Sequence, residues 1–316
     1  MSILEGRVEE IRRGPAPAPK GLQRRARWGE RLVEAFVRLN GVVAVAVLIG
    51  IFVLLVAEGV PILRYVDLWH FFTGSKWYPV SSPPTFGMLP FFVATLWVTL
   101  VATAIALPLG VAAAAYLAEV APAVVREMVK PLIELLAGVP SVVVGFIGLL
   151  VLSPLVREVL HLPTGLNGLT AAIMLAFMSL PVIVSVSEDA LTAVPREYRE
   201  ASYALGCTQW QTIVHVLIPA ALSGITAAVM LGIGRAIGET MTVLVVAGGA
   251  LAIPSSITEP MRPMTATIAA EINNAVQGGL QYQALFAIGV VLFLLTFLVN
   301  LIADVVLERQ KRRFGP

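Results

Sequence analysis

Two side chains of opposite charge, Arg235 and Glu239, stand four residues apart within a long apolar stretch of this sequence. Residues four apart in a helix share a face, so the guanidinium and the carboxylate can meet. A guanidinium matches the geometry of phosphate and other oxyanions. A carboxylate beside it would keep a bound anion from being trapped. The pair indicates either an oxyanion path through an apolar layer or an ion pair that only fixes helix packing.

The other residue types that support chemistry do not form a catalytic site. The three histidines, His70, His161 and His215, are scattered without metal-ligand spacing, and Cys207 has no second cysteine to pair with. A nucleotide-phosphate loop needs Gly-Lys followed by Ser or Thr, and none of the four lysines follows a glycine. We therefore predict a chain without catalytic or metal-binding residues, in which any ATP hydrolysis belongs to another chain.

The stretch around Arg235 is one of several apolar stretches. Apolar residues make up 58% of the chain and charged residues only 13%, whereas about a quarter of a soluble domain is charged. Because open sheet edges cannot be satisfied in lipid, we predict an all-α, polytopic transmembrane bundle. Six spans of about 20 residues or more are expected, at about 41–60, 88–118, 132–156, 166–187, 214–243 and 281–306.

The distribution of basic residues predicts how these spans are oriented. Seventeen of the 22 Lys and Arg residues lie in segments that six spans place on one side, and four lie on the other side. Because basic loops stay on the cytoplasmic side, both termini are expected in the cytoplasm, with the chain in the cytoplasmic membrane. The remaining basic residue, Arg235, falls inside the fifth span.

Three segments make up the predicted domain organisation. Residues 1–41 form a basic cytoplasmic tail, and 24–40 show the periodicity of an amphipathic helix. That helix either lies along the membrane surface or leads directly into the first span. Residues 42–308 form the transmembrane domain, and 309–316 form a second basic cytoplasmic tail.

Two segments on the outer side have distinct compositions. Residues 61–86 are rich in aromatic side chains, which we expect mostly as anchors in the headgroup zone, with a surface for an external protein as the alternative. The aromatic residues are Tyr65, Trp69, Phe71, Phe72, Trp77 and Tyr78. Residues 244–280 mix glycine and proline with a helix-like run and are expected to return into the protein interior.

The inner segment 188–219 carries the most specific local pattern. Pro195 suits the first turn of a helix, and Gly206 suits the left-handed residue that ends one. A second helix is expected to start near Thr208 and to enter the bilayer at Pro219. The pattern predicts a short helix held across the membrane surface, where a soluble partner can push it and so move the fifth span.

This segment resembles the "EAA" loop of binding-protein-dependent ABC importer permeases. The matching residues are Glu200, Ala201, Ser202, Gly206, Val216, Ile218 and Pro219, with Ser202 in place of the second alanine. In that family the short helix seats in a cleft of a separate ATPase subunit. The resemblance therefore implies the type I importer permease fold and assigns ATPase coupling to Pro195–Gly206 and Pro219.

Four further motifs resemble phosphate-specific permeases, in particular the first of their two permease subunits, the PstC type. They are 134–141, 234–241, 264–271 and 282–286, within a match over about 42–308. The resemblance implies a homologous second permease, an ATPase dimer that binds ATP and Mg²⁺, and an external phosphate-binding protein. It also places Arg235 and Glu239 on the phosphate path. It implies membrane lipid around the spans and no nucleic-acid partner.

The function expected from the resemblance is import of phosphate by alternating access, driven by ATP. The nearest alternative is the same architecture carrying molybdate or sulfate. An ion-coupled secondary transporter or channel would need no ATPase and no Glu200–Pro219 spacing. A membrane-embedded enzyme would need a polar catalytic cluster, which the sequence does not contain.

Overall fold

The computed structural model describes residues 20–314, with side chains from 31 to 309. Residues 1–54 and 55–316 form two compact units. The first contains most of α2 (Lys20–Gly59), which runs without a break past residue 41. The predicted helix over 24–40 thus continues directly into the first span, as the lead-in alternative expects. The first nineteen residues of the basic tail, and the last two of the second tail, lie outside the described residues.

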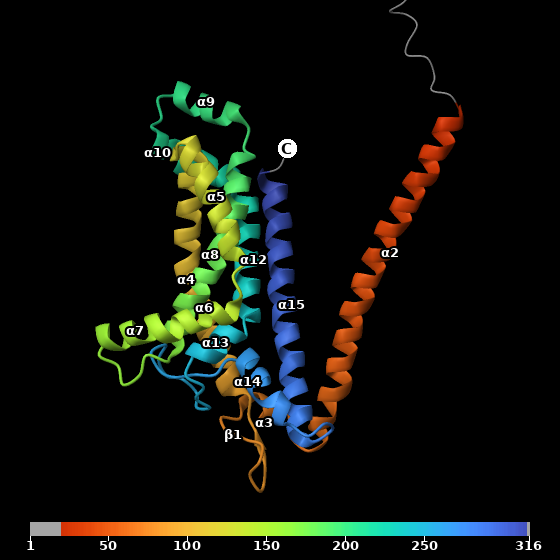
Figure 1. Ribbon diagram of the computed structural model, residues 1–316, viewed down its shortest axis with the longest axis vertical. Coiled ribbons are helices and arrows are strands. Elements are labelled where there is room, and N and C mark those ends of the chain that lie inside the picture. The colour runs from red at the N-terminus through yellow and green to blue at the C-terminus, as the bar shows by residue number, and fades with distance from the viewer. Residues whose placement is uncertain (1–19, 315–316) are drawn as a thin grey trace, which may run out of the picture. The chain divides into compact units, whose positions relative to one another are not determined.

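The second unit is a bundle of upright helices (Figure 1), with α9 across one end and α3 and β1 at the opposite end. Helix α8 packs against α4, α5 and α12, and α12 packs against α15. These elements are α3 (Leu68–Thr73), β1 (Trp77–Tyr78), α4 (Leu89–Ala115), α5 (Ala123–Ala137), α8 (Gly168–Thr192), α9 (Arg196–Ala204), α12 (Leu222–Gly238) and α15 (Leu280–Phe314). Over the described part of the chain, five helical stretches are long and apolar enough to span a membrane, and a bent pair supplies a sixth. The predicted all-α bundle is confirmed.

Small side chains allow α4 and α8 to approach closely. On α4 they recur every fourth residue and are buried: Ala94, Val98, Ala102 and Ala106. A Cβ on Gly110 of α4 would lie 2.6 Å from Ile183 of α8, and one on Gly232 of α12 would lie 2.8 Å from the same side chain. Ile183 therefore fills the space that two glycines leave, which is how small residues bring membrane helices together.

The third apolar stretch covers Ser141–Val159 and not the predicted range 132–156. Helix α5 ends at Ala137, and the next helices, α6 (Ser141–Ile147), η3 (Gly148–Leu152) and α7 (Ser153–Val159), run crosswise near the other end of the bundle (Figure 1). Pro140 has no N–H and disfavours a helical conformation at the residue before it, so the helix cannot continue. A search for uncharged runs alone does not detect such a break.

The outer segment 244–280 returns into the interior, as predicted. Met261, Met264 and Thr267 are fully buried there. Its elements, together with the short helix before it, are α13 (Met241–Val246), α14 (Met264–Glu271) and η5 (Ile272–Asn274).

The aromatic segment 61–86 is only partly exposed. It holds η1 (Val60–Arg64), α3, β1 and β2 (Thr85–Phe86), and β1 pairs antiparallel with β2. Phe71 and Trp77 are buried and pack in the same apolar cluster as Phe86 and Phe91. The Trp77 indole donates to Glu271 at 3.0 Å. For Phe71 and Trp77 the predicted role as membrane anchors is therefore wrong, because burial in the protein core offered more apolar contact.

Candidate functional site

Helix α9 begins and ends as the sequence predicts. Pro195 precedes its first turn in an extended conformation, and Gly206 follows its last turn with φ of +83°. The Gly206 N–H donates to the Tyr203 carbonyl at 2.9 Å, and the Cys207 N–H donates to the Ser202 carbonyl at 3.1 Å. These two bonds form the Schellman arrangement, which satisfies carbonyls that the helix end leaves unpaired.

The chain after Gly206 enters the bundle through a sharp bend. Thr208 caps α10 (Gln209–Thr212) by a reciprocal bond with Gln211. The helix continues through η4 (Ile213–Leu217) and α11 (Ile218–Ala220), which contains Pro219. It meets α12 at an angle of 74°. Pro219 lies just before this bend, and entry of the helix into the bilayer at Pro219 stays a prediction.

The residues predicted for ATPase coupling divide between two faces of α9. Glu200 and Ala201 are exposed, whereas Ser202 is only 5% exposed. The Ser202 hydroxyl lies 2.9 Å from the Thr212 hydroxyl, so it joins α9 to α10. Leu205 and Trp210 are 86% and 71% exposed, which leaves a bare apolar surface around the turn. A soluble partner could cover this surface.

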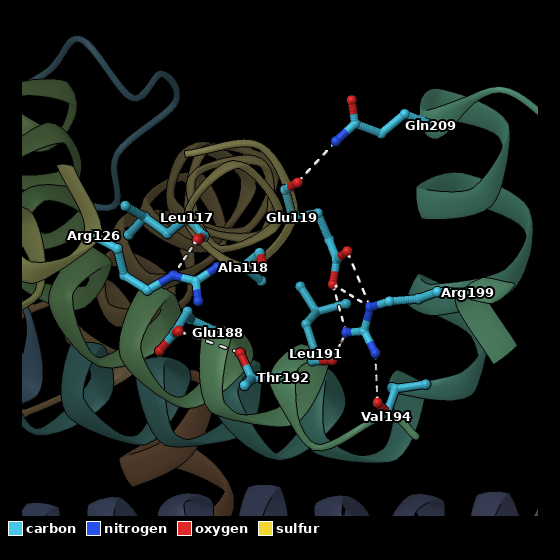
Figure 2. A network of polar contacts seen from close by, with 10 residues as sticks. All are labelled: Leu117, Ala118, Glu119, Arg126, Glu188, Leu191, Thr192, Val194, Arg199 and Gln209. Carbon is cyan, nitrogen blue, oxygen red and sulfur yellow. Dashed lines mark hydrogen bonds and ion pairs between the residues drawn. The ribbon is translucent and has the colours of Figure 1, made fainter. Parts of the chain in front are cut away.

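Arg199 is the polar centre of this end of the bundle (Figure 2). Its Nε donates to both carboxylate oxygens of Glu119, at 3.0 and 3.1 Å, and its Nη2 donates to Oε1 at 2.6 Å. Its remaining donors reach the carbonyl of Leu191 in the last turn of α8 and that of Val194 in the turn that follows α8. The hydrogen bonds to Glu119 raise the pKa of the Arg199 guanidinium above its ordinary value. Glu119 lies in η2 (Tyr116–Val120), which continues α4.

A second ion-pair cluster joins α5 to α8. The Lys130 ammonium donates to Glu188 at 2.6 Å and to Asp189 at 2.8 Å. Glu188 is buried, so an unpaired carboxylate there would be costly. Hydrogen bonds from Asp189 and Glu188 raise the pKa of Lys130, which precedes the third span, above its ordinary value. Lys130 therefore stays charged and keeps Glu188 compensated.

Arg235 and Glu239 are not on one helix, contrary to the sequence prediction. Helix α12 ends at Gly238, and Glu239 has extended backbone angles. The Glu239 carboxylate instead accepts the Thr242 N–H at 3.2 Å, at the start of α13. Arg235 is half-buried and donates to the Ala137 carbonyl at 3.3 Å, where α5 ends. Among the described side chains, Arg235 has no ion-pair partner.

Glu134 is exposed on α5. The cluster of Arg199 and Glu119 and that of Lys130 and Glu188 were not predicted from the sequence. One signal could have found both carboxylates. Glu119 and Glu188 are the first charged residues after the uncharged runs 87–118 and 162–187. A carboxylate that ends an apolar helix needs a nearby cation.

Comparison with known proteins places this geometry in a family. Residues 106–314 match the family described as "Binding-protein-dependent transport system inner membrane component". A probable ABC transporter permease of Bacillus subtilis, YqgH, is 40% identical, covering 77% of this chain and 78% of that protein. The phosphate transport system permease PstC of Mesorhizobium japonicum is 38% identical, covering 84% and 89%.

A solved structure shares the fold. It is the bacterial alginate ABC transporter in complex with an alginate pentasaccharide-bound periplasmic protein. One chain of it matches with a TM-score of 0.61 at 15% identity, over 94% of this chain and 98% of that chain. Permease subunits of such transporters hold no ATPase site, so the ATPase is a separate chain. This multi-pass membrane protein therefore belongs to the family of binding-protein-dependent ABC importer permeases, and phosphate permeases of the PstC type are among its relatives.

Proposed function

We propose that this chain is one permease subunit of an importer that moves inorganic phosphate by alternating access, driven by ATP. The observation that supports ATP-driven transport is the placement of α9. It is a short helix across one end of the bundle that ends at Gly206. The chain then leads through α10 and α11 and a bend before Leu222 into α12. When an ATPase displaces α9, the connecting helices α10 and α11 would transmit that movement to α12.

The proposed assembly contains a homologous second permease, two ATPase subunits and an external phosphate-binding protein. ATP and Mg²⁺ are bound by the ATPases. The α9 end of the second unit faces the cytoplasm in this proposal, because Arg126, Lys130, Arg196 and Arg199 lie in the segments that positive-inside topology retains there. Both termini are proposed to be cytoplasmic because their sequences are basic. Glu200, Ala201 and the apolar turn at Leu205 form the ATPase-facing surface.

Phosphate is the proposed substrate because several relatives at 32–38% identity are phosphate transport permeases. Arg235 is the proposed contact for the anion. Among the described residues it donates to the Ala137 carbonyl alone, at 3.3 Å, which leaves most of the guanidinium donors available. Charge-assisted bonds from these donors would hold an oxyanion more strongly than neutral donors could. Glu239, four residues on, is the proposed counter-charge that keeps the anion from being held too tightly.

Uptake into proteoliposomes tests this proposal. The complete complex is reconstituted with ATP inside and labelled phosphate outside, and unlabelled phosphate, molybdate and sulfate compete in parallel. We expect uptake that requires ATP and the binding protein and that only phosphate blocks efficiently. Uptake without ATP would identify a secondary transporter. Blocking by molybdate or sulfate in preference to phosphate would assign the substrate to another oxyanion.

A further inference from the structure

Helix α4 is not next to α9 in the sequence, but hydrogen bonds between side chains and backbone join the two elements. The chain leads from α8 into α9, and from α9 through α10 towards α12. The α4 helix and its continuation η2 end at Val120, about 75 residues before α9 begins. Yet Glu119 in η2 accepts three contacts from Arg199 of α9, and its backbone carbonyl accepts the Gln209 side chain at 2.8 Å.

The geometry of the ion pair between Arg199 and Glu119 opposes separation of the two side chains. The two side chains are only 18% and 8% exposed, so water competes weakly for their hydrogen bonds. The planar guanidinium meets both carboxylate oxygens, which fixes the orientation of the groups as well as their distance. The same guanidinium holds one carbonyl in the last turn of α8 and one in the turn that follows α8, so it ties α4, α8 and α9 together (Figure 2).

We propose that Arg199 is a positioning residue that transmits displacement of α9 to α4 through Glu119. This inference rests on the proposed function, in which an ATPase displaces α9. Helix α12 receives the displacement along the chain, whereas α4 receives it through a side-chain ion pair. Loss of the pair would let α9 move while α4 stays behind, so ATP would be hydrolysed without productive movement of the bundle.

The test is the amount of substrate transported per ATP hydrolysed in proteoliposomes that contain the complete complex. We expect Arg199→Gln to lower this ratio roughly fivefold or more, the usual range of coupling between two sites, while ATP hydrolysis continues. Arg199→Lys keeps the positive charge but loses the planar guanidinium that meets both carboxylate oxygens. Its ratio of substrate transported to ATP hydrolysed should lie between those of the wild type and Arg199→Gln. The double exchange Glu119→Arg with Arg199→Glu should recover part of the ratio, because it restores an ion pair.

Arg126→Gln is the matched control. The Arg126 guanidinium donates to the carbonyls of Leu117 and Ala118, so it secures the same end of α4 without reaching α9 (Figure 2). A general loss of structure lowers transport and hydrolysis together and leaves their ratio unchanged. The inference is overturned if Arg199→Gln keeps the wild-type ratio, or if Arg126→Gln lowers the ratio equally.

The wild-type complex separates this inference from the proposed function. Transport of an oxyanion other than phosphate by the wild-type complex would refute the proposed substrate. The ratio in each variant is then measured with the anion that the wild type carries, so the role of Arg199 is judged independently of the substrate.

Discussion

Gly206 offers a test of whether the geometry of the turn after α9 matters for coupling. Its φ of +83° lies in the left-handed region, and no heavy atom lies within 4 Å of the position that a Cβ would occupy. Alanine would therefore meet no steric clash with its surroundings. The cost of Gly206→Ala is then the conformational cost of an L-residue in this region, roughly 1–2 kcal/mol.

A cost of this size shifts a two-state equilibrium by a factor of roughly 5–30. Because the alternative states are other ways of ending α9, the substitution should alter how α9 is presented to the ATPase. We expect Gly206→Ala to lower the amount of phosphate transported per ATP hydrolysed. Gly206→Asn should have a smaller effect, since asparagine tolerates the left-handed conformation better than alanine.

Gly278 provides a control with the same conformational cost. Its φ is +75°, its Cβ position is equally empty, and it lies in the loop before α15, a helix that begins at the end of the bundle opposite α9 (Figure 1). Both alanine variants should lower the thermal unfolding midpoint by a similar amount, but only Gly206→Ala should lower the amount of phosphate transported per ATP hydrolysed. A wild-type ratio in Gly206→Ala, or an equal loss in Gly278→Ala, would refute the reasoning about the turn.

Three further outcomes are expected. Arg235→Ala should abolish phosphate uptake in an assembled complex, because the proposed path loses its cation; uptake at the wild-type rate would remove Arg235 from that path. Leu205→Asp should weaken copurification with the ATPase while leaving the thermal unfolding midpoint nearly unchanged, because the side chain is 86% exposed and makes few contacts within the chain; unaltered copurification would exclude Leu205 from the docking surface. Gly110→Ala should destabilise the chain by about 1–3 kcal/mol, because the added methyl would lie 2.6 Å from Cγ2 of Ile183. Thermal unfolding should show partial recovery in the double variant with Ile183→Leu, which has no methyl branch at Cβ, and equal destabilisation in both would contradict this account of the packing.

The predictions that held rest on local signals. Helix α9 and its stop follow from Pro195 and Gly206, whose backbone preferences act within a few residues. Uncharged runs located most spans, because the cost of burying charge in lipid acts along one helix at a time. The return of 244–280 into the interior followed from the rule that irregular backbone must be covered by protein.

The predictions that failed assumed a continuous helix or needed long-range contacts. Glu239 was expected on the same face as Arg235, but α12 ends at Gly238 between them. The third span was expected to continue past Ala137, although Pro140 follows three residues later. The pair of Arg199 and Glu119 joins residues 80 positions apart, and no periodicity within one segment reports such a contact.

The two carboxylates at the ends of the uncharged runs also oppose sliding of α4 and α8 along their own axes. Glu119 and Glu188 each hold a cation from a neighbouring element at the α9 end. Sliding either helix inward by one turn, about 5.4 Å, would draw an ion pair towards the hydrocarbon layer. In the proposed transport cycle we therefore expect α4 and α8 to tilt or rotate at constant depth rather than to slide along their axes.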